Sequence, residues 1–175
     1  MLKKISIIII TIIIYLFICN HIYKNTPYKI KPIINNYITD KEESPIGKII
    51  IKKITINNNL YNINSKHNNI EENITILEDS IMPDKTNSIM YIAAHSGDGK
   101  IAYFNDLDKL KTNDEITIIY KNKKYIYSVK NIWEENKNGY IHINRENEKQ
   151  LILTTCSKTK KNKQLVINST LKEVY

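Results

Sequence analysis

Glycine, proline, cysteine and arginine are all scarce in this chain. Its 175 residues include four glycines, four prolines and two cysteines, and Arg145 is the single arginine. The sequence has no glycine-rich phosphate loop, no paired cysteines at metal-ligand spacing and no internal repeat, which excludes the usual nucleotide-binding, zinc-finger and solenoid patterns. We therefore predict no cofactor, and no metal at the functional site.

Positive charge is plentiful, but scattered lysines carry nearly all of it. The formal net charge is +8, from 26 basic and 18 acidic residues. A nucleic-acid binding surface usually gathers its basic side chains on one face or stripe. Dispersed lysines more simply keep a domain soluble, so we expect no nucleic-acid partner.

The N-terminus resembles a membrane-targeting segment. Lys3 and Lys4 precede an almost unbroken apolar run over residues 5–18. A basic flank before an apolar core keeps the N-terminus in the cytoplasm and directs the remainder outward. No small-residue cleavage site follows, and the residue before Cys19 is too large for a lipobox. An uncleaved anchor over residues 1–23 is therefore favoured over the alternative, a cleaved signal peptide.

The segment after the anchor is typical of a linker. Residues 24–44 are polar, contain Pro27 and Pro32 and lack a sustained period. We predict a stalk here, followed by one folded domain over residues 45–175. The expected location is the cell membrane, with a single crossing, a cytoplasmic N-terminus and the domain outside the cell.

Short strands dominate the pattern of the folded part. Regular spacing of short strands favours a closed or nearly closed barrel. Residues 57–59 are a plausible turn, 122 marks the turn of a hairpin, and apolar residues between 103 and 110 have helical spacing. The eight expected strands are 49–56, 60–63, 89–94, 116–120, 124–133, 140–143, 151–155 and 164–174.

Two of these strands end in a reactive side chain. The apolar run 151–155 leads into Cys156, and the run 89–94, about sixty residues upstream, leads into His95. A disulfide from Cys156 to Cys19 is not expected, because the two lie in different environments. A lone cysteine is most often a small buried hydrophobe, but a free thiol paired with a histidine in space is the pattern of a cysteine nucleophile and its base.

The order of these parts resembles the sortases, the membrane-anchored cysteine transpeptidases of Gram-positive bacteria. The resemblance rests on an anchor and stalk, a β domain, the run AHSG at 94–97 and the run LILTTC at 151–156. It covers nearly all of residues 46–175. It implies a mainly β fold: a closed eight-stranded sortase-like β-barrel with one or two short helices, preceded by an N-terminal transmembrane helix.

The resemblance also implies a reaction and its partners. Cys156 would attack a backbone carbonyl in the C-terminal sorting signal of a secreted protein, giving a thioacyl enzyme. An amine acceptor, such as a cell-wall precursor or a pilin lysine, would then resolve it. His95 would protonate the departing amine and deprotonate the incoming one. Thr155 and Ser96, beside these two residues, would contact the substrate, although Thr155 is equally consistent with a strand-filling residue.

One departure from the family pattern concerns its arginine, which follows the cysteine and stabilises the oxyanion. Lys163 stands at the matching position here, and a shifted alignment that uses Arg145 remains an alternative. Lysine keeps the charge but loses the planar fork of arginine. Loss of one oxyanion donor costs about 3 kcal/mol in other enzymes. We therefore expect Lys163 to support a slower enzyme.

Two other classes of function compete with the transpeptidase. A papain-like protease or an L,D-transpeptidase does not fit, because the histidine precedes the cysteine, no helix carries the cysteine and no serine-x-glycine-cysteine run is present. A catalytically silent, membrane-tethered β module that binds other surface proteins stays open, because Lys163 replaces the expected arginine.

Overall fold

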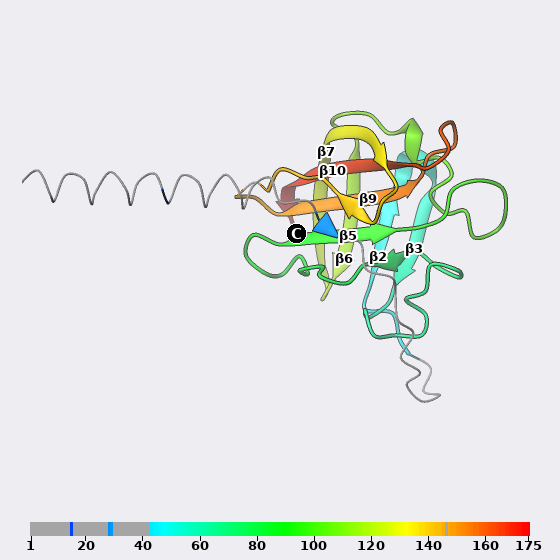
Figure 1. Cartoon of the computed structure of the whole chain (residues 1–175). Helices are drawn as coiled ribbons and strands as arrows, with labels where there is room; N and C mark the ends of the chain where they lie inside the picture. Colours follow the sequence, from blue (N-terminus) through cyan, green and yellow to red (C-terminus); the bar gives the residue numbers. More distant parts are fainter. Residues whose placement is uncertain (1–14, 16–27, 30–42, 146) are drawn as a thin grey trace, which may run out of the picture.

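The computed structural model describes Tyr15, residues 28–29, 43–145 and 147–175 (Figure 1). Most of the predicted anchor (1–23) and stalk (24–44) therefore lies outside the described residues. Within the described part, no helix has the length and the apolar composition needed to cross a bilayer.

Eight strands form one sheet, in the order β3-β2-β6-β7-β10-β9-β5-β4. A separate two-stranded pairing joins β1 to β8, and two short 3-10 helices connect strands. The elements are β1 (Tyr28–Lys29), β2 (Gly47–Ile51), η1 (Lys52–Ile54), β3 (Ile56–Leu60), β4 (Thr75–Ile76), β5 (Ile89–Ala93), η2 (Leu107–Lys109), β6 (Glu115–Tyr120), β7 (Lys123–Asn136), β8 (Tyr140–Ile141), β9 (Gln150–Cys156) and β10 (Lys163–Val174).

The predicted mainly β barrel is confirmed, with one correction. The sheet curls into a barrel (Figure 1), but its two edge strands, β3 and β4, are not paired with each other in the described residues. The barrel is therefore nearly closed and not closed as predicted. Complete closure needs a ladder between the edge strands, and β4 is only two residues long.

Two strand predictions were also wrong in detail. Residues 57–59 lie inside β3, and the chain turns earlier, through η1 and Thr55, whose φ is 59°. The sequence did not indicate this turn, because Lys52 and Lys53 within an apolar run are not a turn signature. The predicted strand 140–143 is not in the barrel: it is β8, paired to β1, and the eighth barrel strand is β4.

The sheet region that carries the candidate site is buried on both faces. Every residue of β5 is buried, as are the first six residues of β9. On the inner face, Met90, Ile92, Leu151 and Leu153 belong to the barrel core. On the outer face, alternate residues of the same strands, such as Ile152, pack in a second cluster with Ile141, Ile143 and Val166. Ile141 and Ile143 belong to the connection from β7 to β9. Burial on both faces explains why these strands are unbroken apolar runs without alternation.

Asn68 caps the open edge of the barrel at β4. Its side-chain amide donates to the carbonyl of Ile76 at 2.8 Å, and its Oδ1 accepts from the backbone N–H of Ile76 at 2.8 Å. It also donates to the carbonyl of Ile63 at 3.3 Å. The side chain is 1% exposed. The amide thus takes the place of a ninth strand over one residue and satisfies edge groups that would otherwise be buried without partners.

Replacing Asn68 by alanine should lower the free energy of unfolding by about 3 kcal/mol, because a buried backbone donor and acceptor both lose their partners. Urea unfolding of the full-length chain, followed by the fluorescence of its one tryptophan, Trp133, measures this. The matched control is Asn64→Ala in the same loop, where the side chain is exposed and the change should stay within about 0.5 kcal/mol. Equal midpoints for both variants would contradict the capping role.

Candidate active site

His95 and Cys156 follow the ends of two neighbouring parallel strands. β5 and β9 run side by side in the same direction (Figure 1), with Ala93 opposite Thr154. Continuing this register by two residues sets His95 opposite Cys156. Side chains alternate between the two faces of a sheet, and Ala93 and Ile152 face the outer cluster. His95 is two residues after Ala93 and Cys156 is four residues after Ile152, so both side chains project from that outer face.

Hydroxyl groups join the two strands where their backbone ladder ends. The last bond of the ladder, from the N–H of Ala94 to the carbonyl of Thr154, is 3.4 Å long. Beyond it, Thr155 Oγ1 donates to the carbonyl of Ala94 at 2.8 Å, and Ser96 Oγ donates to the carbonyl of Cys156 at 2.7 Å. The donors of the two predicted substrate contacts, Thr155 and Ser96, are thus used to hold His95 and Cys156 side by side.

His95 is fixed through its backbone and has a carboxylate next to its ring. Its carbonyl accepts from the N–H of Phe104 at 2.9 Å, which folds the following loop back onto the strand end. Its side chain is 33% exposed, and Nε2 lies 3.5 Å from Glu71 Oε1. Within the described residues no hydrogen bond joins His95 to Cys156.

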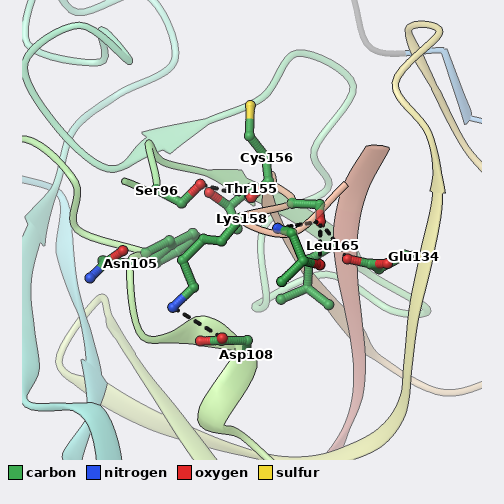
Figure 2. A pocket seen from close by; sticks show the side chains of 11 residues that line it. Ser96, Asn105, Asp108, Glu134, Thr155, Cys156, Lys158 and Leu165 are labelled. Carbon is green, nitrogen blue, oxygen red and sulfur yellow. Dashed lines mark hydrogen bonds and ion pairs between the residues drawn. The ribbon is translucent and has the colours of Figure 1, made fainter. Parts of the chain in front are cut away.

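The Cys156 thiol is free and half-buried. Its Sγ lies 3.1 Å from Nζ of Lys137, in the turn after β7. Figure 2 shows a pocket at the end of β9, in which the sulfur of Cys156 points away from Lys158 and Asp108. Cys156 is one of the residues that line this pocket, together with Ser96, Thr155 and Leu165.

Gln164, and not Lys163, faces the thiol across β9 and β10. Gln164 is opposite Cys156 in the antiparallel register, and on its other side it is opposite Glu135 of β7. It is 3% exposed, and its Nε2 donates to Glu135 Oε1 at 3.1 Å and to the carbonyl of Tyr140 at 2.7 Å. His95, Cys156, Gln164 and Glu135 therefore form one row across four strands, which we call the outer row.

Neither basic residue singled out from the sequence reaches the outer row. Lys163 is two residues before Leu165, which packs in the barrel core, so its side chain projects from the inner face, opposite to the thiol. There it acts on Glu134, whose pKa it helps to lower. Arg145 follows Asn144, whose carbonyl binds the side chain of Gln150. Gln150 is the first residue of β9 and Cys156 is the last, which separates them by about 20 Å. Arg145 therefore lies near the opposite end of β9 from the thiol.

The turn from β9 to β10 is organised around Glu134 on the inner face. Ser157 Oγ donates to Glu134 Oε1 at 2.5 Å, and Lys160 Nζ lies 2.7 Å from Oε2. The hydrogen bond from Lys160, with that from Ser157, lowers the pKa of Glu134. This network fixes the segment that follows the thiol.

Sequence reasoning missed Lys137, Gln164 and Glu71. The parity of Gln164 relative to Cys156 depends on the length of the turn between β9 and β10, which the sequence does not state. Lys137 and Glu71 lie in connections, where no hydrophobic period indicates direction. Only Lys137 carried a local signal, since the run Asn138-Gly139 after it is a turn signature.

A family model described as the sortase domain matches residues 49–172. The chain belongs to the sortase family. The match spans all barrel strands except β2's first two residues and β10's last two. A search of curated proteins found no significant match to this sortase.

Solved sortases share the fold of this one. Sortase A from Corynebacterium diphtheriae, a lid mutant, superposes with a TM-score of 0.64 at 22% identity, covering 77% of this chain and 73% of that one. Sortase C-3 from Streptococcus pneumoniae gives 0.67 at 20%, covering 84% and 72%. Sortase C2 of Group B Streptococcus pilus island 1 gives 0.65 at 19%, covering 86% and 88%. At these identities the likeness establishes the fold.

Removing the Thr155 hydroxyl should loosen the pairing of the two strand ends. Thr155→Val keeps the shape of the side chain but takes away the donor to the buried carbonyl of Ala94, so the free energy of unfolding should fall by about 1–2 kcal/mol. The control is Thr117→Val at a half-buried site on β6. Urea unfolding measures both, and no difference between the two variants would contradict the tie.

The Glu134 network should make stability depend on pH. Because the folded pKa of Glu134 is below its ordinary value, its contribution is complete above about pH 4.5 and is lost as the pH falls through the folded pKa. The difference in unfolding free energy between the wild type and Glu134→Gln should therefore shrink on acidification. Lys160→Met, which removes the main partner, should reduce this pH-dependent difference. A difference that is constant with pH would be inconsistent with the network.

Proposed function

We propose that this sortase is a cysteine transpeptidase that cleaves a C-terminal sorting signal of secreted proteins and transfers the acyl group to an amine. The supporting observation is the register of β5 and β9, which brings His95 and a half-buried free thiol, Cys156, to adjoining strand ends on one face. That arrangement fits a nucleophile and a proton-transfer group.

In the first half of the reaction, the Cys156 thiolate attacks the carbonyl carbon of the scissile peptide. A carbon–sulfur bond forms and the carbonyl π pair moves to oxygen, giving a tetrahedral oxyanion. When it collapses, the carbon–nitrogen bond breaks and the imidazolium of His95 gives its proton to the departing amine. The product is a thioacyl enzyme with neutral His95.

In the second half, the acceptor amine attacks the thioacyl carbon. Neutral His95 takes the proton that the nitrogen loses, the carbon–sulfur bond breaks and the thiolate is restored. A cell-wall precursor amine and a pilin lysine are both suitable acceptors. No cofactor enters either half-reaction, because the sulfur supplies the nucleophile and the imidazole carries the proton.

The same proposal places the enzyme at the cell membrane. The basic flank and apolar run of residues 1–23 support a single crossing with a cytoplasmic N-terminus. The barrel then lies outside the cell, where secreted substrates emerge. The stalk of residues 24–44 sets its distance from the bilayer.

A catalytically silent binding module is the second candidate. The observation that favours it is Gln164, a neutral and fully engaged side chain at the strand position next to the thiol. The neighbouring strand position thus supplies no cation for the negative charge that the reaction develops.

The decisive test is capture of the acyl enzyme. The full-length protein is mixed with a pooled library of threonine-containing peptides, and intact-mass and peptide mapping locate any adduct, with hydroxylamine as the acceptor in a parallel sample. The wild type should acylate Cys156 and release hydroxamates, and Cys156→Ala should do neither. His95→Asn should slow acylation by about a hundredfold or more, because proton transfer to the leaving amine is lost.

The matched control is His67→Asn, at a loop histidine that packs against Tyr61 and should behave as the wild type. A folded wild type that forms no adduct with any peptide would favour the binding module. Acylation that persists in His95→Asn at the wild-type rate would remove His95 from the mechanism.

A further inference from the structure

We propose that the ammonium of Lys137 is the cation that stabilises negative charge at Cys156 during the reaction. The inference rests on the proposed transpeptidase function and adds a residue to its site. It is carried by the contact between Lys137 Nζ and Cys156 Sγ, at 3.1 Å.

The position of Lys137 follows from strand parity and from one backbone bond. Glu135 lies in the outer row, and Lys137 is two residues further along, so its side chain leaves the same face as the thiol. Its backbone N–H donates to the carbonyl of Asn162 at 2.9 Å. Asn162 has a φ of 60° and closes the turn before β10. The bond extends the β7–β10 ladder by one step and holds the base of the lysine beside the thiol.

The other candidates for this role lack the geometry. The side chain of Lys163 projects from the inner face, where Glu134 lies. Arg145 is at the far end of β9. Gln164 is neutral and its amide nitrogen already has two acceptors. In the part of the chain that the structure describes, Lys137 is the cation in hydrogen-bond contact with the sulfur.

Two species in the reaction carry a negative charge at this place. The first is the thiolate itself, and the second is the oxyanion on the carbon that the sulfur has attacked. The flexible side chain of Lys137 can reach both, because its Nζ already contacts the sulfur. Lys137 donates charge-assisted hydrogen bonds, first to sulfur and then to oxygen.

The remaining charged groups around the thiol are paired elsewhere. On the outer face, Glu71 lies next to His95, and Glu135 Oε2 is 2.8 Å from His142 Nδ1. On the inner face, the charged pairs are Lys160 with Glu134 and Lys158 with Asp108, and Lys163 adds a further positive charge. No carboxylate among the described residues forms an ion pair with Lys137, so its charge acts on the sulfur.

Alkylation by iodoacetamide tests the pairing without any sorting peptide. The rate at Cys156 is followed at pH 7 in the full-length protein by peptide mapping, which separates it from Cys19. Lys137→Met should react about tenfold more slowly, because the cation next to the thiolate is lost. Lys137→Arg should retain the wild-type rate, because the charge is kept. Lys130→Met, an exposed lysine on β7, is the matched control and should not change it.

Peptide acylation provides the second measurement. Iodoacetamide forms no oxyanion, so the acylation rate of Lys137→Met should fall further than its alkylation rate, by about a hundredfold. If Lys137→Met matches the wild type in alkylation, or if Lys163→Met produces the slower alkylation in its place, the assignment is overturned.

The two measurements separate this inference from the proposed function. Slower alkylation in Lys137→Met, together with no acylation in the wild type, would support the thiolate pairing and remove the transpeptidase. Acylation by the wild type, together with unchanged alkylation in Lys137→Met, would support the transpeptidase and remove the pairing.

Discussion

The parallel pairing of β5 with β9 is the constraint on which the rest of the site depends. The sheet is otherwise antiparallel, and only here do two neighbouring strands of the described sheet deliver their C-terminal ends to the same edge. An antiparallel pair would separate the imidazole and the sulfur by the length of a strand. Burial on both faces makes this pairing strongly specified, because a slip of one residue would drive polar side chains into one of the two apolar clusters.

The site has a rigid half and an adaptable half. His95 and Cys156 stand on strand ends that two hydroxyl bonds hold together. Lys137 stands on a tight turn, on a long side chain that reaches across the outer row. An arginine at the position of Gln164 would place the charge on a strand. This sortase fills that position with a buried amide, which ties β10 to Glu135 and to the carbonyl of Tyr140.

The sequence could predict the elements but not the register that relates them. Apolar runs that end in Cys156 and His95 predicted the strand ends, and the alternation of 124–133 predicted β7. The role expected for Lys163 was wrongly placed by one residue. The turn between β9 and β10 pairs Gln164 with Cys156, so the side chain of Lys163 projects from the other face. The cap at Asn68 was also out of reach, since a side chain that imitates a strand leaves no periodic pattern.

The distance along the chain between β5 and β9 has a consequence for how the enzyme matures. About sixty residues must be ordered before these two strands meet, and contacts of such long range form late in folding. β10, which completes the outer row, follows β9 in the chain. A barrel that lacks β9 and β10 therefore contains His95 and Lys137 but neither the thiol nor the strand that completes the row.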